Sequence, residues 1–205
     1  MGIRAAAAVL AMLWCQQATA QDAAAVGTVV QQLGTVTALR GAGPGLLLIG
    51  APVFRSDRIV TAAASRVRIE FVDRSVLAIG PDSDVVVADY LVDGDDNRLR
   101  GVISLLFGIV RATVGPGRPD AAFDIESRAA VASVRATDWV VEVQSDRTSV
   151  FVVEGTVTVA AASGAGSVVL TAGQGTDVLI DRVPAEPKLW GAARVRDVLD
   201  RTRVP

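Results

Sequence analysis

The side chains best placed for chemistry are Asp93, Asp95 and Asn97, which stand at alternate positions like the first ligands of a calcium-binding loop. An EF-hand loop that began at Asp93 would need glycine at its sixth position and glutamate at its twelfth. Those positions hold Arg98 and Ser104. The calcium pattern is therefore incomplete, and we expect a solvated polar turn between strands at 93–97.

Other catalytic and metal-binding constellations are missing from the sequence. It contains no histidine and a single cysteine, Cys15, which excludes histidine-based triads, Cys–His dyads, zinc fingers and c-type haem attachment. No spacing singles out a carboxylate pair for glycoside hydrolysis. The glycine-rich stretches 41–45 and 115–117 lack the lysine and the helix start of a phosphate cradle. We therefore expect a protein that is not an enzyme, that holds no cofactor or metal, and that acts by binding.

The charge pattern argues against a nucleic-acid partner. The formal net charge is −2, and Lys188 is the only lysine. The arginines are scattered and interleaved with carboxylates, as in Arg55, Asp57 and Arg58. A surface that binds nucleic acid needs a basic stripe, commonly with aromatic residues between the charges. The sequence therefore predicts no nucleic-acid binding.

The first twenty residues have the pattern of an export signal. Residues 1–4 are short and positive, and residues 5–14 form an apolar run that is too short to span a bilayer. Residues 18–20 then match the A-x-A cleavage pattern. We expect cleavage between Ala20 and Gln21 and an exported, periplasmic protein. A secreted or outer-membrane-associated protein is the alternative.

A lipid-anchored N-terminus is the alternative to this cleavage, because Cys15 could be acylated. A lipoprotein signal needs a small residue before the cysteine, and this chain has Trp14 there. After cleavage at Ala20 the mature chain would hold no cysteine, so packing and hydrogen bonds alone would stabilise it. No later stretch is apolar over the roughly 20 residues that a membrane-spanning helix requires, so we expect no integral membrane span.

Strands dominate the rest of the chain. Hydrophobic residues make up 51% of the sequence but aromatic residues only 4%, so the apolar residues are mainly aliphatic. The valine-rich pattern, punctuated by glycine, favours short strands. Residues 66–71 alternate strictly, with Val67, Ile69 and Phe71 on one face. That period of two indicates a half-buried strand. The turn at 73–75 and the apolar residues 76–79 complete a predicted hairpin.

Further short strands follow at intervals typical of a sandwich or a solenoid. Residues 101–114 could suit a helix, but Gly108 and the β-branched residues favour strands. Loops are expected at 41–45 and 115–120. The other predicted strands are 26–39 as a pair with a bend at Gly34, 46–49, 85–88, 123–125, 139–143, 150–153 and 156–159 around Glu154 and Gly155, and 168–170 and 176–180 around residues 173–175.

The C-terminal residues change character. Pro184 and Pro187 interrupt the strand pattern. Residues 189–201 follow helical spacing, and the residues near one face are Leu189, Ala192, Ala193, Val195 or Arg196, and Leu199. The sequence thus predicts an all-β, sandwich- or solenoid-like domain with a short C-terminal helix. Its expected division is a signal peptide at 1–20, a β-domain at 21–183 and a proline-bounded tail at 184–205.

Four phrases in order resemble the FecR domain, the extracytoplasmic domain of bacterial FecR-type signalling proteins. F-V-D-R-S-V-L at 71–77 is similar to the family's F-x-D-G-[ST]-x-L, and V-R-A-T-D-W at 134–139 to its V-R-G-T-[DE]-[FW]. Residues 150–159 are similar to its V-x-V-x-E-G-x-V-x-V, and residues 170–175 to its L-x-x-G-[QE]-x. Together the resemblance covers most of residues 27–180.

Two positions depart from the family pattern. Arg74 and Ala136 stand where glycine is typical. Glycine there could serve a positive φ or a close approach of the backbone. An arginine or alanine therefore implies either an ordinary φ or local strain.

The resemblance also implies a function. Family members that transmit iron signals have a cytoplasmic sigma-factor-binding segment, a membrane span and the periplasmic domain. In this sequence a signal peptide takes the place of the first two, so we expect a stand-alone protein without direct contact with a cytoplasmic sigma factor. The function expected is a periplasmic binding module that engages an envelope protein or component in signalling or regulation. The alternative is a structural or scaffold protein of the outer membrane or cell surface.

Arg135, Thr137, Asp138 and Trp139 are the candidate binding residues, because Arg and Trp are common interface anchors. A structural interpretation competes and is the one we favour from sequence. In it, Trp139 belongs to the core, as the alternation with Val141 and Val143 suggests, Arg135 pairs with an internal carboxylate and Thr137 satisfies a turn.

Overall fold

The computed structural model describes residues 24–41, 43–115 and 121–205. The expected signal peptide, its cleavage site and Cys15 lie outside the described residues, as do residues 116–120 of the loop predicted at 115–120. Within the described ranges, no helix is long and apolar enough to cross a membrane.

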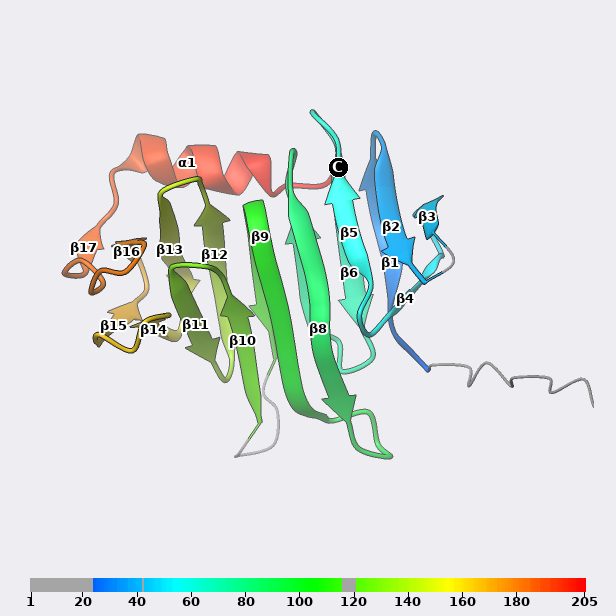
Figure 1. Cartoon of the computed structure of the whole chain (residues 1–205), viewed down its shortest axis with the longest axis horizontal. Coiled ribbons are helices and arrows are strands. Elements are labelled where there is room, and N and C mark those ends of the chain that lie inside the picture. The colour runs from blue at the N-terminus through cyan, green and yellow to red at the C-terminus, as the bar shows by residue number, and fades with distance from the viewer. Residues whose placement is uncertain (1–23, 42, 116–120) are drawn as a thin grey trace, which may run out of the picture.

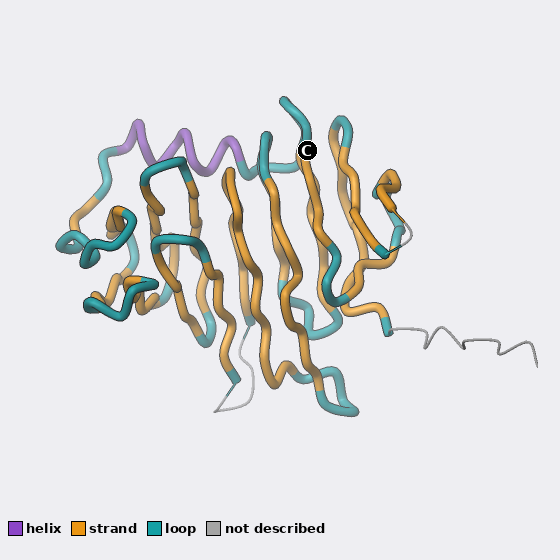
Figure 2. Tube along the Cα trace, in the orientation of Figure 1, coloured by secondary structure: helices purple, strands orange, loops and turns teal. Residues whose placement is uncertain are grey.

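The described part of the chain is built from strands, with one helix near its C-terminal end (Figures 1 and 2). The predicted all-β fold with a short C-terminal helix is confirmed. The elements are β1 (Ala25–Leu33), β2 (Val36–Arg40), β3 (Gly43–Leu46), β4 (Pro52–Phe54), β5 (Arg58–Thr61), β6 (Arg66–Phe71), β7 (Val76–Ile79), β8 (Asp84–Val92), β9 (Arg98–Val114), β10 (Ala122–Glu126), β11 (Ala130–Val134), β12 (Thr137–Val143), β13 (Arg147–Glu154), β14 (Thr156–Ala161), β15 (Ser167–Thr171), β16 (Gln174–Leu179), β17 (Lys188–Leu189) and α1 (Ala192–Arg201).

The long strand β9 connects two leaves of one mixed sheet. Its first part pairs with β8 and, in parallel, with β10, and its second part pairs with β7 and β12. Leaf A has the order β4–β1–β6–β7–β9–β12–β13–β16–β17. Leaf B has the order β3–β2–β5–β8–β9–β10–β11–β14–β15.

Gly108 marks the point where β9 passes from leaf B to leaf A. Phe107 is still paired with Asp84 of β8, whereas Gly108 is paired with Val143 of β12. Gly108 has φ +93°, and a Cβ added there would lie 2.2 Å from Oγ of Ser83. Only glycine fits this crossing, because both the backbone conformation and the space exclude a side chain.

The two leaves face each other across a common core, so the fold is a sandwich. An aromatic row crosses the interface, with Phe71 of β6 stacked on Tyr90 of β8 at 4.2 Å between ring centroids. Phe123 of β10 meets the rings of Tyr90 and Trp139 edge to face, at 6.3 and 5.6 Å. Each of these contacts is of a kind that adds to the stability from burial.

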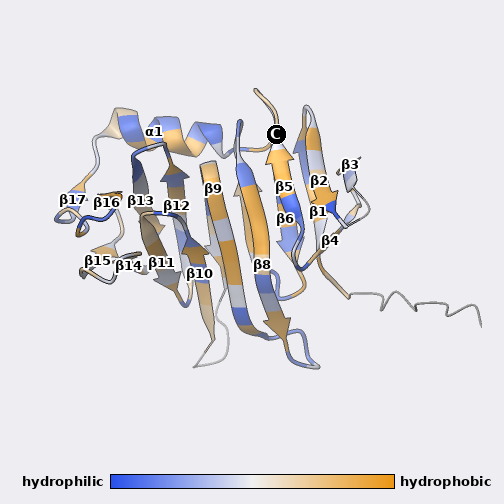
Figure 3. Ribbon diagram, viewed as in Figure 1, coloured by the Kyte–Doolittle hydropathy of each residue, from blue (hydrophilic) through white to orange (hydrophobic). Residues whose placement is uncertain are grey.

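The period-two strands behave as predicted. In β6, Val67, Ile69 and Phe71 are at most 2% exposed, while the intervening residues are exposed or half-buried. The hairpin with β7 also forms as expected. Figure 3 shows the same interleaving of hydrophobic and hydrophilic residues along other strands.

Helix α1 packs on the outer face of leaf A and creates a second, smaller core. In Figure 1 the helix runs along the upper end of the strands. Trp190 stacks on Phe151 with 5.0 Å between the ring centroids, and Val198 of the helix is 1% exposed. The predicted apolar face of the helix is right in part, because Val195 and Leu199 pack against this core. Ala192 and Ala193 are exposed, and Leu189 is 76% exposed and lies before the helix begins. Trp190 supplies the anchor instead.

The predicted strand at 46–49 is also wrong. The strand β3 lies earlier, within the expected loop at 41–45, and pairs with β2 at the edge of leaf B. Leu47 alone of the four apolar residues is buried, while Leu46, Leu48 and Ile49 are exposed. At the edge of a sheet, one inward-facing side chain is enough to anchor a segment to the core. An apolar run at an edge therefore need not form a strand.

Candidate functional site

Three family motifs place their turns at one end of the sandwich. These turns are 73–75 between β6 and β7, 135–136 between β11 and β12, and 154–155 between β13 and β14. The polar turn 93–97 lies at the same end, which is the lower end in Figure 1. We call this region, comprising these four turns, the motif end.

The buried arginine Arg98 joins two of the motifs. Its Nη1 donates to Oδ2 of Asp73 at 2.5 Å and to Oγ of Ser75 at 2.9 Å, and its Nη2 donates to the backbone oxygen of Arg135 at 3.2 Å. The side chains of Arg98 and Asp73 are 1% and 5% exposed. The guanidinium also lies over the ring of Phe123, 5.6 Å from its centroid.

Asp73 accepts hydrogen bonds from every side of this cluster. The hydroxyl of Tyr90 donates to its Oδ1 at 2.6 Å, and Ser75 donates its backbone N–H and its hydroxyl. Burial raises the pKa of Tyr90 above its ordinary value, and the negative charge of Asp73 raises it further. The phenol therefore stays protonated, as a donor, and the aspartate of the first motif has a structural role.

Sequence reasoning missed Arg98, which it treated only as the residue that breaks the calcium pattern. Arg100 stands two positions later, and nothing in the local sequence separates the two. In the structure Arg98 is buried, whereas the Arg100 side chain is 58% exposed. The one available signal was the aspartate of the first motif, because a buried carboxylate needs a donor.

Three of the four candidate residues have structural partners. Trp139 is 0% exposed and packs edge to face on Phe123. Thr137 donates its hydroxyl to the backbone oxygen of Thr156 at 3.0 Å. Asp138 accepts both hydrogen bonds of a fork from Arg111, at 2.8 and 2.6 Å. That pair raises the pKa of the Arg111 guanidinium.

Arg135 differs from its neighbours. Its side chain is exposed and forms no hydrogen bond or ion pair with any residue that the structure describes. The expected pairing of Arg135 with an internal carboxylate is therefore wrong for the described residues, and Arg98 is the arginine that makes such a pair. The backbone of Arg135 is fixed by Arg98, while its guanidinium remains available.

An open groove runs beside Arg135. Its volume is about 550 Å³, and its lining includes Arg135 and the hydroxyl residues Ser133, Thr156 and Thr158. The groove crosses β11 and β14, which are paired in leaf B. A guanidinium next to several hydroxyl groups suits recognition of a polar or acidic partner.

The polar turn 93–97 forms as predicted. Oδ1 of Asp93 accepts hydrogen bonds from the backbone N–H groups of Asp95 and Asn97, at 3.0 and 2.9 Å. This carboxylate therefore closes its own turn. In the described ranges no cluster of three or more His, Cys, Asp and Glu residues is arranged to hold a metal ion.

Arg74 and Ala136, which stand where the family has glycine, differ in the sign of φ. Arg74 has φ +65°, in the left-handed region, whereas Ala136 is not among the residues with positive φ. The space beside Ala136 is taken by Gly155, which has φ +91°, and a Cβ at Gly155 would lie 2.9 Å from the oxygen of Ala136. The strain considered from sequence is thus present at Arg74.

Substitution by glycine should therefore act in opposite directions at these positions. We expect Arg74→Gly to raise the free energy of unfolding by about 0.5–1 kcal/mol, because glycine adopts a positive φ without steric cost. Ala136→Gly should lower it by about 0.5–1 kcal/mol through added freedom of the unfolded chain. Urea denaturation measures both, and a loss of stability in Arg74→Gly would contradict the strain at Arg74.

Comparison with known proteins gives a family and a fold. The FecR protein family model matches residues 57–158. Two crystal structures of a candidate anti-sigma factor from Parabacteroides distasonis ATCC 8503, at 1.65 and 2.50 Å, each superpose with a TM-score of 0.57 at 15% identity. The match covers 69% of this chain and 64% and 63% of those chains, so this chain spans less than two thirds of their length. The comparison with curated proteins found no match.

The matched region includes β9, Arg98 and the turns 73–75, 135–136 and 154–155 of the motif end. The resemblance drawn from short motifs is thereby confirmed over residues 57–158, and the fourth motif, at 170–175, lies outside the match. Residues 57–158 of this chain are a FecR domain.

Proposed function

We propose that this protein is an exported, periplasmic binding module without enzymatic activity, which takes part in signalling or regulation by engaging an envelope protein or component through its motif end. The FecR family match supports a signalling or regulatory role. The proposal includes no nucleic-acid partner and no direct contact with a cytoplasmic sigma factor.

The observation that carries the proposal is the contrast between Arg135 and the residues around it. Arg98 fixes the backbone of the 135–136 turn, and Thr137 and Asp138 have partners inside the domain. Arg135 alone of the four candidates presents an unpaired charge, within the described residues, beside an open groove. Because the backbone of the turn is already held, binding through Arg135 would order its side chain but not its backbone, and the guanidinium fork suits recognition of an acidic group.

If the protein were instead a structural or scaffold protein, we would expect the edges of its sheets to be covered. Leaf B instead ends at β3 and β15, which each pair on one side within the described chain. Leu46 of β3 is 68% exposed, and Val169 of β15 is 56% exposed. Open edges with apolar side chains permit docking by strand addition. They favour a binding module over a scaffold.

Site-specific cross-linking can test the motif end as the interface. A photo-reactive amino acid at position 135 should give a discrete adduct in envelope extracts of the native host. The same residue at position 128 is the control, because Arg128 is exposed but lies in the β10–β11 turn at the opposite end of these strands. Equal adducts at both positions, or an adduct at 128 alone, would contradict the proposal.

A further inference from the structure

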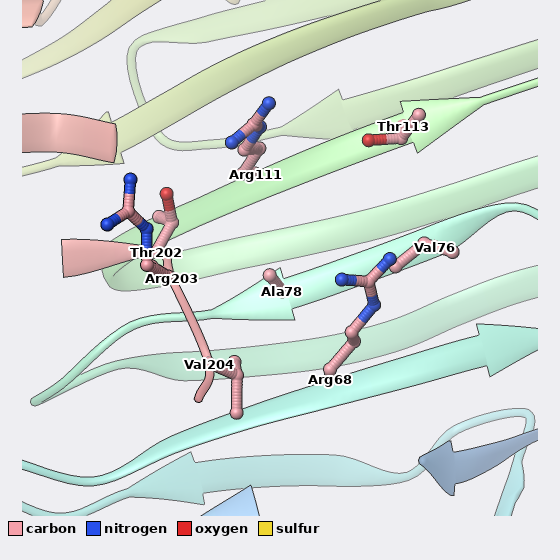
Figure 4. Close-up of a pocket in the computed structure, with 8 residues that line it drawn as sticks. All are labelled: Arg68, Val76, Ala78, Arg111, Thr113, Thr202, Arg203 and Val204. Carbon is pink, nitrogen blue, oxygen red and sulfur yellow. The ribbon is translucent and has the colours of Figure 1, made fainter. Parts of the chain in front are cut away.

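A pocket on the outer face of leaf A gathers three arginines from separate elements (Figure 4). It has a volume of about 180 Å³ and lies between strands β6, β7 and β9 and the residues that follow α1. Arg68 comes from β6, Arg111 from β9 and Arg203 from the C-terminal residues. Its lining includes the hydroxyl residues Thr113 and Thr202 but no carboxylate.

The strand register explains why the pocket is there. Arg68 is paired with Ala78, and Ala78 is paired with Arg111, so one small residue stands between two arginines on adjacent strands. Neighbouring strands lie about 4.8 Å apart, which places the two arginine backbones about 10 Å apart. The small side chain of Ala78 thus leaves space between the two long arginine side chains, and Ala78 forms the floor of the pocket.

The guanidinium groups have hydrogen-bonding capacity to spare. Arg68 is exposed and forms no hydrogen bond or ion pair with any described residue. Arg111 donates its Nε and Nη2 to Asp138, which leaves Nη1. The ion pair of Arg203 with Asp200 is loose, at 3.8 Å, and the Arg203 side chain is 76% exposed.

The chain above the pocket is held in place independently of any ligand. Nε of Arg66 donates to the backbone oxygen of Arg201 at 3.0 Å, and the Arg201 side chain donates to Glu142 at 2.6 Å. Thr202 donates its hydroxyl to the oxygen of Val198 at 2.9 Å. A wall that is already ordered lowers the entropic cost of binding.

We propose that this pocket binds a small tetrahedral oxyanion of the phosphate or sulfate class, either free or as part of a lipid headgroup. Guanidinium forks match the oxygen atoms of such ions, and binding is strongest where charge-assisted bonds come in pairs. The donors come from three arginines and Thr113 on separate elements, and this spread suits a tetrahedral ion better than a planar carboxylate. The site shares no residue with the groove beside Arg135. A test of anion binding at this pocket is therefore independent of the test of the proposed function.

Calorimetric titration with inorganic phosphate, at constant ionic strength against chloride and acetate, tests the pocket. We expect phosphate to bind more tightly than acetate, and Arg68→Gln to weaken phosphate binding about tenfold through loss of a charge-assisted contact. Ala78→Leu, which fills the floor but keeps the arginines, should weaken binding too. Arg128→Gln is the matched control, because Arg128 is also exposed and unpaired within the described residues.

Two results would overturn the proposal. One is wild-type protein that binds phosphate no better than chloride at equal ionic strength. The other is Arg68→Gln protein that binds phosphate as the wild type does.

Sedimentation with phosphatidylglycerol vesicles separates the two sources of the ion. Co-sedimentation that phosphate displaces and that Arg68→Gln abolishes assigns the headgroup, and phosphate binding without co-sedimentation assigns the free ion.

Discussion

Arg98→Met should lower the free energy of unfolding by about 3–5 kcal/mol, because it leaves the buried carboxylate of Asp73 without its counter-charge. The substitution also removes the donor that ties the 135–136 turn to the first motif. A loss of this size is a large share of the roughly 5–15 kcal/mol that stabilises a typical domain. Urea denaturation followed by tryptophan fluorescence would measure it.

Arg100→Met provides the matched control on the same strand. The Arg100 side chain is exposed and lies 3.8 Å from Asp89, so its removal should cost at most about 1 kcal/mol. Adding Asp73→Leu to Arg98→Met should recover part of the lost stability, because no charge is then left buried alone. Equal losses in Arg98→Met and Arg100→Met would contradict the role given to Arg98.

Trp139→Ala should be comparably severe. Trp139 is fully buried between the leaves and packs on Phe123, and truncation of such a residue costs about 3–5 kcal/mol through lost contacts and the cavity that remains. A folding defect of this size would mask any direct role of Trp139 in binding.

Trp139→Phe is the informative comparison. Nε1 of Trp139 is buried without a hydrogen-bond partner among the described residues, so phenylalanine removes volume but no hydrogen bond. Its cost should be less than half that of Trp139→Ala, in the range of about 1–2 kcal/mol for a partial loss of core volume. Urea midpoints of the two variants test this, and equal losses would show that the indole has a partner or role beyond packing.

The sequence was sufficient for elements whose signal is local. The alternation in β6 predicted both the strand and its buried face, and the alternation from Trp139 to Val143 predicted that Trp139 lies in the core. Val140, between them, is also buried, at 1% exposed, because α1 covers the outer face of β12. A period of two reports one buried face, and it carries no information about a distant segment that covers the other.

The remaining features depend on contacts between distant residues. Strand β9 was ambiguous because it belongs to both leaves and is therefore apolar over much of its length, without one constant buried face. The pairing of Arg98 with Asp73 spans 25 residues and of Arg98 with the Arg135 oxygen spans 37. The exposed position of Arg135 also depends on these distant contacts. The sequence named Arg135 as a candidate but assigned its side chain the wrong surroundings.

The most direct test of the binding account compares capture of an envelope partner by wild-type protein and by Arg135→Ala protein, at equal amounts of folded protein. The Arg135 side chain has no partner within the described domain, so we expect an unchanged melting temperature together with loss of capture. Arg128→Ala should leave both unchanged. A lowered melting temperature with undiminished capture by Arg135→Ala would contradict the account and show that the arginine is structural.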